Sequence, residues 1–440
     1  MTELTPQTPE VVVALDIGTT KVCCLAARRD SHGKLEILGA GKVESTGVLR
    51  GVVSNIEKTV KAIREAVDSC ERQAGMKFHT VYVGIAGQHI KSLQHRGILT
   101  RENDHTEISR RDIDRLVNDM FKLVLPPGDK IIHVFPQEFT VDNEQGISDP
   151  IGMCGVRLEA NFHIITGQIT AINNLYRCVE KAGLKVADLT LEPIASAEAV
   201  LYEEERQAGV ALVDIGGGTT DITVFHEDII RHTAVIPFGG NVVTSDIKEG
   251  CTVLQPQAEK LKVRFGSALA SEVYENRIIT IPGLRGREHK EISEKNLARI
   301  IQARMEEIFD YVLWEIRRSG YERKLIGGLV LTGGGALLHH VDKLAELHTG
   351  MSCRIGLPVE HLAHGYRESV NSPVFSTAIG LLLRGLEDVS RKEKTTEAQA
   401  SAEPKGPSNV SEEKPLGWLN NVLRKTKEWF EAEPDVDFKR

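Results

Sequence analysis

This 440-residue chain lacks several features that mark well-known classes of protein. No apolar run approaches the roughly 18 residues that a membrane-spanning helix requires, and residues 1–10 have no apolar segment typical of a secretory signal. The seven cysteines are scattered and include no Cys-x-x-Cys pair, so we expect reduced thiols in a cytosolic protein, without a disulfide framework or a zinc site. The net charge of −8 argues against general nucleic-acid binding, which requires a basic face.

The chain does contain a duplicated loop. Residues 16–21 (DIGTTK) follow an apolar run over 11–15, and residues 214–221 (DIGGGTTD) follow an apolar run over 210–213. Each copy predicts a buried strand, a turn and a second strand, and one copy alone would be an ordinary hairpin turn. Because the pattern occurs twice in the same strand context, we predict two hairpins that face each other across a cleft and hold one polyphosphate.

The small and hydroxyl-bearing positions of both loops are the candidate phosphate ligands, because glycine exposes backbone N–H groups and threonine adds donors. They are Gly18, Thr19, Thr20 and Lys21 in the first loop, and Gly216, Gly217, Gly218, Thr219 and Thr220 in the second. Asp16 and Asp214 end the preceding strands and are candidates to hold a hydrated Mg²⁺, which prefers oxygen ligands. Neither the P-loop pattern nor the dinucleotide-binding glycine spacing is present.

A third glycine-rich loop follows another apolar strand near the end of the fold. Gly333, Gly334 and Gly335 come directly after the run LVLT at 329–332. Residues 336–347 read as a helix, whose N-terminus would offer unpaired N–H donors and the positive end of a dipole. The sequence therefore predicts a third element beside the same ligand.

The order of these patterns predicts a duplicated α/β fold with an insertion. From residue 88 to 165 the α/β pattern is interrupted by a short helix near Arg110–Met120 and by extended segments, which indicates an inserted α+β subdomain. Afterwards the pattern resumes, with a helical stretch over 241–265 and a long helix over 294–318. Right-handed crossovers would place the loops at the carboxyl ends of the strands, where such folds bind ligands.

The C-terminal residues differ from the rest of the chain. Residues 386–413 are rich in Glu, Lys, Ser, Thr, Pro and Ala, which predicts a disordered linker. The following amphipathic segment, within 414–430, carries its apolar side chains on one half of a helical wheel: Leu416, Trp418, Leu419, Val422, Leu423, Trp429 and Phe430. It could dock on the core or in a partner's groove. The two tryptophans and the basic opposite face favour a helix that lies on an anionic membrane surface, held reversibly unless polymerisation adds avidity.

Together these features resemble the FtsA family, the actin-like bacterial cell-division proteins of the actin, heat-shock and sugar-kinase superfamily. The resemblance is carried by residues 81–93 (VYVGIAGQHIKSL), by residues 133–167 and by the C-terminal helix. It implies a duplicated actin-like (ribonuclease H-like) ATPase fold. Its subdomains would be 1A (11–86 and 166–207), the inserted 1C (87–165), 2A (208–238 and 322–385) and 2B (239–321), followed by the linker and the helix.

The resemblance also implies ATP and Mg²⁺ at the two hairpins, with Gly333 to Gly335 beside the adenosine. Glu259 and Lys262 match the position where relatives clamp ribose and base, although an i, i+3 pair is more commonly a solvated surface pair. Glu192 matches an acidic residue that holds a metal-bound water; without the family it is a strand-end carboxylate. Glu192 and Asp214 are the catalytic candidates. Such proteins bind ATP firmly and hydrolyse it weakly if at all.

Partners follow from the resemblance in the same way. Members self-associate into actin-like filaments through 1C and 2B, bind the C-terminal peptide of the tubulin-like protein FtsZ on 2B, and recruit later division proteins at midcell on the cytoplasmic face of the membrane. Lys295, Arg299 and Arg304 on the long helix are candidates to meet that peptide, or are a solvated basic face. Rivals on the same fold are a small-molecule kinase, a heat-shock chaperone and a pilus-assembly or cell-shape protein; none of these explains both the insertion and the tail.

Overall fold

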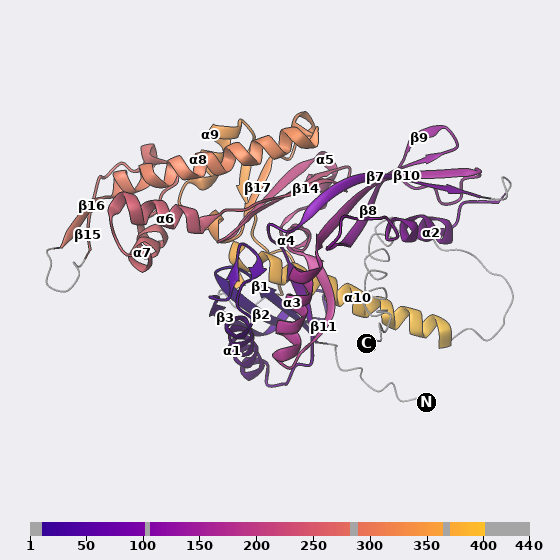
Figure 1. Cartoon of the computed structure of the whole chain (residues 1–440), viewed down its shortest axis with the longest axis horizontal. Helices are drawn as coiled ribbons and strands as arrows, with labels where there is room; N and C mark the ends of the chain where they lie inside the picture. The colour runs from indigo at the N-terminus through magenta and orange to yellow at the C-terminus, as the bar shows by residue number, and fades with distance from the viewer. Residues whose placement is uncertain (1–10, 102–105, 282–288, 364–369, 401–440) are drawn as a thin grey trace, which may run out of the picture. The chain divides into compact units, whose positions relative to one another are not determined.

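The computed structural model describes residues 11–101, 106–281, 289–363 and 370–400. Two compact units divide the chain (Figure 1). The main unit contains the residues up to 88 and residues 175–385, and the inserted unit contains residues 89–174 together with the chain from 386. Among the described residues, no helix combines the length and the apolarity needed to cross a membrane.

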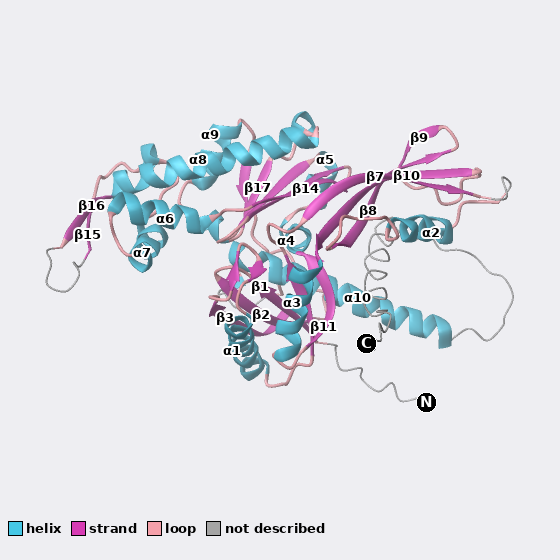
Figure 2. Ribbon diagram, in the orientation of Figure 1, coloured by secondary structure: helices cyan, strands magenta, loops and turns pink. Residues whose placement is uncertain are grey.

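Ten strands of the main unit form two sheets (Figure 2). The first sheet contains β1 (Val12–Ile17), β2 (Lys21–Arg29), β3 (Leu35–Glu44), β6 (Thr80–Ile85) and β11 (Lys185–Leu191). The second contains β12 (Val210–Ile215), β13 (Thr220–His226), β14 (Ile229–Ile236), β17 (Leu329–Thr332) and β18 (Cys353–Ile355). Two short ribbons pair β4 (Val48–Leu49) with β5 (Val52–Val53), and β15 (Ile278–Ile281) with β16 (Lys290–Ser293).

The two sheets have one topology. The strand order is β11-β6-β1-β2-β3 in the first and β18-β17-β12-β13-β14 in the second. In each, the first three strands form an antiparallel meander, and the remaining two continue the sheet in parallel from its first strand. This identity confirms the predicted duplication, and it makes β1–β2 and β12–β13 equivalent hairpins.

The helices are interspersed with these strands along the chain. They are α1 (Ile56–Ala74), α3 (Ile169–Lys181), α4 (Glu192–Val200), α5 (Glu203–Ala208), α6 (Gly240–Cys251), α7 (Gln255–Phe265), α8 (Glu294–Ser319), α9 (Val341–Thr349) and α10 (Ser376–Ala400). Short 3-10 turns are η1 (Ala270–Glu272), η2 (Glu322–Lys324), η3 (Gly334–Leu337) and η5 (Pro373–Phe375). Helix α1 packs closely on β3, where a Cβ at Gly41 would lie 1.9 Å from the Ala66 carbonyl oxygen.

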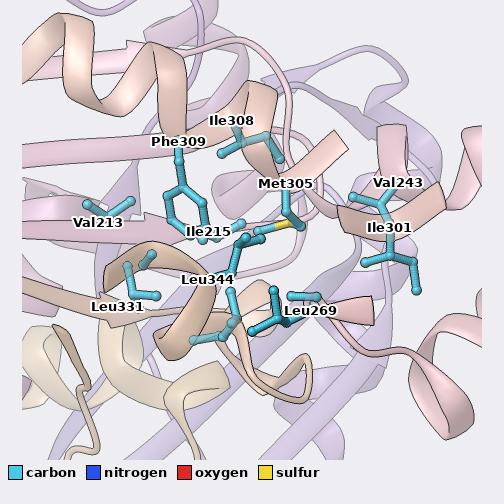
Figure 3. Close-up of a cluster of buried hydrophobic side chains, with 14 of the residues drawn as sticks. Val213, Ile215, Val243, Leu269, Ile301, Met305, Ile308, Phe309, Leu331 and Leu344 are labelled. Carbon is cyan, nitrogen blue, oxygen red and sulfur yellow. The ribbon is translucent and has the colours of Figure 1, made fainter. Parts of the chain in front are cut away.

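The core of the second half lies between its sheet and α8 (Figure 3). Ile301, Met305, Ile308 and Phe309 recur at the three- and four-residue spacing of one helix face, and all are essentially buried. They pack with the side chains of β12, including Ile215, which is also fully buried. Burying an isoleucine contributes about 2 kcal/mol. The last residue before the second glycine loop is therefore anchored in the core.

Three predicted elements differ from the structure. The stretch 241–265 is two helices, because Thr252 ends α6 with a left-handed φ of 52° and a proline in the first turn of α7 cannot lie inside a continuous helix. The helix predicted over 336–347 starts only at Val341, after the turn η3 and a left-handed His340 (φ 61°). The linker predicted from 386 is helical up to Ala400, since Lys, Glu and Ala have high helix propensity.

The inserted unit confirms the predicted α+β insertion. Its strands β7 (Lys91–Thr100), β8 (Asp129–Val141), β9 (Glu144–Ile147) and β10 (Arg157–Gln168) form an antiparallel sheet in the order β7-β10-β8-β9. Helix α2 (Arg110–Met120) covers one face of this sheet. A Cβ at Gly97 would lie 2.8 Å from both Met120 Cε and Phe162 Cε2, so glycine allows the helix to approach the sheet.

Candidate functional site

The first candidate loop is the turn between β1 and β2. The Gly18 N–H donates to the Lys21 carbonyl at 2.9 Å and closes the turn. Asp16 is the last residue but one of the buried strand β1 and is itself only 3% exposed. Its carboxylate pairs with the ammonium of Lys21, and although burial opposes the charge, the attraction of Asp16 raises the pKa of Lys21 above its usual value. The loop thus holds one carboxylate and one cation at the end of β1.

The second loop repeats this turn between β12 and β13. The Gly216 N–H donates to the Thr219 carbonyl at 2.9 Å, the same spacing as in the first loop. Asp214 lies opposite Asp221 in the strand register, and the Thr219 hydroxyl donates to Asp221 Oδ2 at 3.0 Å. The Thr220 hydroxyl turns away and donates to the Phe238 carbonyl at 3.0 Å. Thr220 is thus already bonded within the protein.

The two loops touch each other through their glycines and threonines. A Cβ added at Gly217 would lie 2.3 Å from Thr20 Cγ2, and one at Gly218 would lie 2.5 Å from Thr19 Oγ1. Real Cβ atoms do not come so close to their neighbours, so a side chain at either position would force the loops apart. The glycines are required for the contact between the hairpins.

The third loop approaches the second hairpin by its backbone. Gly333 has a left-handed φ of 80°, and a Cβ there would lie 2.2 Å from Asp214 Oδ1, so only glycine fits. A Cβ at Gly335 would lie 2.3 Å from Ile215 Cγ2, whereas one at Gly334 would meet no atom within 4 Å. The loop continues into the turn η3. The predicted α-helix N-terminus is therefore not at these glycines.

Glu259 and Lys262 belong to a network with the second hairpin. The ammonium of Lys262 lies 2.8 Å from Glu259 Oε2 and donates to the Gly240 carbonyl at 2.9 Å and to the Thr244 hydroxyl at 2.8 Å. The Gly240 N–H in turn donates to the Gly216 carbonyl at 2.9 Å. The Lys262 side chain is only 12% exposed, which excludes a fully solvated surface pair. Gly240 therefore links the Glu259–Lys262 pair to the turn of the second loop through hydrogen bonds.

Carboxylates gather where the two hairpins meet, and burial changes their protonation. Burial raises the pKa of Asp214 to about 6, with a hydrogen bond from Ser196 acting in the opposite direction. Burial and the charge of Asp214 raise the pKa of Asp221 to about 8. Glu192, at the start of α4, has its pKa raised well above the usual value by burial and by the neighbouring aspartates.

This cluster suits a hydrated divalent cation better than a directly bound one. Asp16, Glu192, Asp214 and Asp221 contribute four carboxylates, and the charge of Lys21 acts on both Glu192 and Asp214. Within the described chain, Asp221 Oδ1 is buried without a hydrogen-bond partner. No set of three or more described His, Cys, Asp or Glu residues is close enough to hold a metal ion itself. Water molecules would have to complete the shell of a cation such as Mg²⁺.

Asp221 was not among the residues chosen from the sequence, although it ends the same DIGGGTTD segment. The signal was available, because Asp214 and Asp221 are equally far from the centre of the predicted hairpin and must therefore lie side by side. When the loop is interpreted only as a set of phosphate ligands, the cross-strand pairing of Asp214 with Asp221 is overlooked.

The candidates for partner and membrane binding lie elsewhere. Lys295 is partly buried and Arg299 is exposed, four positions apart on α8. Arg304 is half a turn around the helix from Lys295, and its guanidinium pairs with Asp246 (Nε to Oδ2 2.5 Å, Nη2 to Oδ1 3.1 Å). A shared role in partner binding stays a prediction. The apolar residues between 416 and 430, and the linker from 401, lie outside the described residues.

Comparison with known proteins identifies the family. Residues 211–380 match the model for "Cell division protein FtsA", and residues 87–166 match the model for the "SHS2 domain inserted in FTSA". The cell division protein FtsA of Pseudomonas aeruginosa is 39% identical over 429 residues, which cover 97% of this chain and 99% of the relative. FtsA of Escherichia coli K12 is 35% identical over 400 residues, covering 89% and 94%.

Solved structures with the same fold are more distant in sequence. The PilM–PilN type IV pilus biogenesis complex matches with a TM-score of 0.63 at 14% identity, over 87% of this chain and 99% of the solved chain. MreB5 of Spiroplasma citri bound to ADP matches with a TM-score of 0.51 at 17% identity, over 90% and 100%. These matches confirm the predicted actin-like fold class, and with the sequence relatives they lead to one conclusion: the chain belongs to the FtsA family of cell-division proteins.

Proposed function

We propose that the protein binds one ATP with Mg²⁺ between its two hairpins and uses the nucleotide as a conformational and assembly switch. The observation that carries this proposal is the junction itself. Two loops of identical turn geometry touch through Gly217 and Gly218, with four carboxylates and the Lys21 ammonium at their bases. Such an excess of negative charge is unfavourable without a cation, and a polyphosphate brings one.

The residues divide into phosphate-, metal- and nucleoside-facing groups. The N–H groups of Gly217 and Gly218 and the Thr19 hydroxyl would be the donors for phosphate oxygens, with the Lys21 ammonium as the opposite charge. Asp16 and Asp214 would hold Mg²⁺ through water, and Glu192 would orient a water molecule beside it. Mg²⁺, when bound, would offset the charge of the phosphates. The open space over Gly334 suits the adenosine, and Glu259 with Lys262 would clamp its ribose and base.

Hydrolysis is a minor part of the proposal. Phosphoryl transfer requires an oriented nucleophile as well as positioning and a metal. Glu192 and Asp214 are the candidate bases. The pKa of Glu192 is raised well above its usual value, which favours the protonated form, whereas the pKa of Asp214 is raised only to about 6. A protonated carboxyl is a poor base, so the surroundings of Glu192 fit weak turnover.

At the level of the cell, we propose a peripheral membrane protein that tethers FtsZ filaments to the cytoplasmic face of the membrane at midcell. Family membership supports self-association into actin-like filaments, binding of the FtsZ C-terminal peptide on 2B near Lys295, Arg299 and Arg304, and recruitment of later division proteins. The amphipathic pattern of residues 416–430 supports attachment to an anionic lipid surface. Filament formation would multiply these weak attachments into firm binding.

The tether is tested by sedimentation with anionic vesicles. Deletion of residues 416–440, or Trp418→Glu combined with Phe430→Glu, should abolish pelleting and leave ATP binding unchanged, because the change affects only the apolar face of the tail. Asn420→Ser combined with Asn421→Ser alters the opposite face and serves as the matched control. Pelleting of the truncated protein would contradict the membrane assignment. Turnover of a sugar or of acetate at millimolar concentration would instead favour the small-molecule kinase.

A further inference from the structure

A pair of buried hydroxyls lies behind Asp214, away from the loop glycines. The Ser196 hydroxyl on α4 donates to Asp214 Oδ2 at 2.8 Å, and Ser196 Oγ lies 3.0 Å from Thr377 Oγ1 on α10. Ser196 has no exposed surface and Thr377 is 7% exposed. A hydroxyl has a single proton to donate. When Asp214 is ionised, Ser196 gives its proton to the carboxylate, and Thr377 is then the donor in the second bond. The Thr377 hydroxyl also acts on Asp214 itself and lowers the pKa of that carboxyl.

The same carboxylate is enclosed on its other side. A Cβ at Gly333 would lie 2.2 Å from Asp214 Oδ1, so the backbone of the third loop closes against that oxygen. Ser376, the residue before Thr377, forms a hydrogen bond with the strand that leads into this loop. Ser376 Oγ lies 2.7 Å from Oγ1 of Thr332, the last residue of β17. The first turn of α10 therefore bonds to Ser196 and to Thr332, the two residues that neighbour Asp214 from α4 and β17. Each oxygen of the carboxylate has a neighbour, Ser196 at Oδ2 and Gly333 at Oδ1.

The hydroxyl bonds also act on the charge of Asp214. Its surroundings contain groups of both signs: Asp16 and Lys21 from the first hairpin, Glu192 from α4 and Asp221 from β13. Burial and the neighbouring carboxylates favour the neutral acid, whereas Lys21, Ser196 and Thr377 favour the carboxylate. Hydrogen bonds to an ionised acceptor are about twice as strong as those to a neutral one. A hydroxyl that donates to Asp214 therefore suits a carboxylate that faces a cation.

We propose that Ser196 and Thr377 are positioning residues of the cation site: Thr377 donates to Ser196, Ser196 donates to Asp214, and Asp214 is thereby held in the orientation that meets a hydrated Mg²⁺. The inference rests on the proposed function, because it concerns the same ATP and Mg²⁺ site. The two hydroxyls come from α4 and from the first turn of α10, so they join the two halves of the main unit at Asp214. They are assigned a role through Asp214 and no contact with the nucleotide.

The test compares variants of the full-length protein in ATP titrations with Mg²⁺ and with EDTA in its place. Thr377→Val keeps the shape and removes the hydroxyl, Thr377→Ser keeps the hydroxyl, and Ser196→Ala removes the direct donor. We expect Ser196→Ala and Thr377→Val to weaken ATP binding about 10-fold with Mg²⁺ but about 2-fold or less with EDTA, because Asp214 is proposed to meet only the hydrated cation. Thr377→Ser should match the wild type in both conditions.

Each outcome has a consequence. A loss of affinity of equal size with Mg²⁺ and with EDTA, or no loss in either hydroxyl-free variant, would overturn the inference while leaving ATP binding by the wild type intact. Absence of ATP binding by the wild type would overturn the proposed function as well. If Ser196→Ala does not fold, the Thr377→Val and Thr377→Ser pair decides alone. In an Asp214→Asn background, Ser196→Ala should add no further Mg²⁺-dependent loss; an added loss would contradict the route through Asp214.

Discussion

The two hairpins have the same turn and the same place in their sheets, yet the residue opposite each aspartate differs. In the first hairpin Asp16 lies opposite Cys23 and pairs with Lys21. In the second, Asp214 lies opposite Asp221, and no described lysine or arginine forms an ion pair with either. The first copy is therefore balanced in charge without a ligand, and the second is not. The two copies share the backbone of the turn and differ in the charged residues at its base.

The largest effect should come from separating the hairpins. Gly218→Val puts a branched side chain against Thr19, so the loops cannot touch, and we expect ATP affinity to fall by about 100-fold or more (roughly 3 kcal/mol). Gly334→Val is the matched variant: its side chain enters open space, so it should weaken ATP binding without lowering the melting temperature. Calorimetric titration and thermal unfolding measure both. ATP affinity of Gly218→Val equal to that of the wild type would contradict the shared site.

The next largest effect is expected on the stability of the first hairpin, where Lys21 balances the charge of Asp16. Lys21→Met leaves Asp16 buried without its partner, and breaking such a pair costs about 3 kcal/mol. We expect this loss in the free energy of unfolding, measured with urea in the absence of nucleotide. Lys21→Arg keeps the charge and should lose less. If Lys21→Met is as stable as the wild type, the first hairpin does not depend on this ion pair.

In the second hairpin, where Asp214 lies opposite Asp221, removal of a charged side chain should stabilise the folded protein. Burial raises the pKa of Asp221 to about 8, so between about pH 4 and pH 8 the folded protein holds a proton that the unfolded chain has lost. Its contribution to stability is therefore greatest below about pH 4 and falls as the pH rises, by at most about 1.4 kcal/mol per pH unit. Asp221→Asn should raise the melting temperature near pH 8 and change it little near pH 4.

The control for that experiment is Mg²⁺ itself. With ATP and Mg²⁺ present, the cation offsets the charge of Asp221, and the advantage of Asp221→Asn near pH 8 should shrink. A difference in melting temperature between Asp221→Asn and the wild type that does not change with pH would show that Asp221 is not protonated in the folded state.

The smallest effect is expected at the position opposite Asp16. Cys23 is fully buried, and burial raises its pKa to about 12, so it stays a neutral thiol. Cys23→Ala should cost about 1 kcal/mol through a small cavity and should leave the pH dependence of stability and ATP affinity unchanged. An altered pH profile would mean that the two cross-strand positions are more alike than their residues suggest.

Much of the fold was predictable because it depends on patterns within single segments. Buried strands followed by Gly/Thr turns predicted both hairpins, and the apolar spacing of 294–318 predicted α8. The errors arose where one residue overrides a longer pattern. The first-turn proline of α7 divides the helical stretch over 241–265, and His340 delays α9 beyond the third glycine loop.

The candidate site was predictable in its residues but not in its contacts. Gly217 and Gly218 were chosen as phosphate ligands, and the structure adds that each lies against a threonine of the other hairpin. Ser196 and Thr377 carry no local signal, because their bond to each other and to Asp214 joins three segments far apart in the sequence. Only the assembled fold brings such residues together.

The central claim is that both hairpins bind one ATP, and a calorimetric titration of the full-length protein with ATP, with and without Mg²⁺, tests it most directly. The account predicts one nucleotide per chain and a Mg²⁺-dependent affinity that both Asp16→Asn and Asp214→Asn weaken by at least about 10-fold. Wild-type affinity in either variant, or two nucleotides per chain, would contradict it.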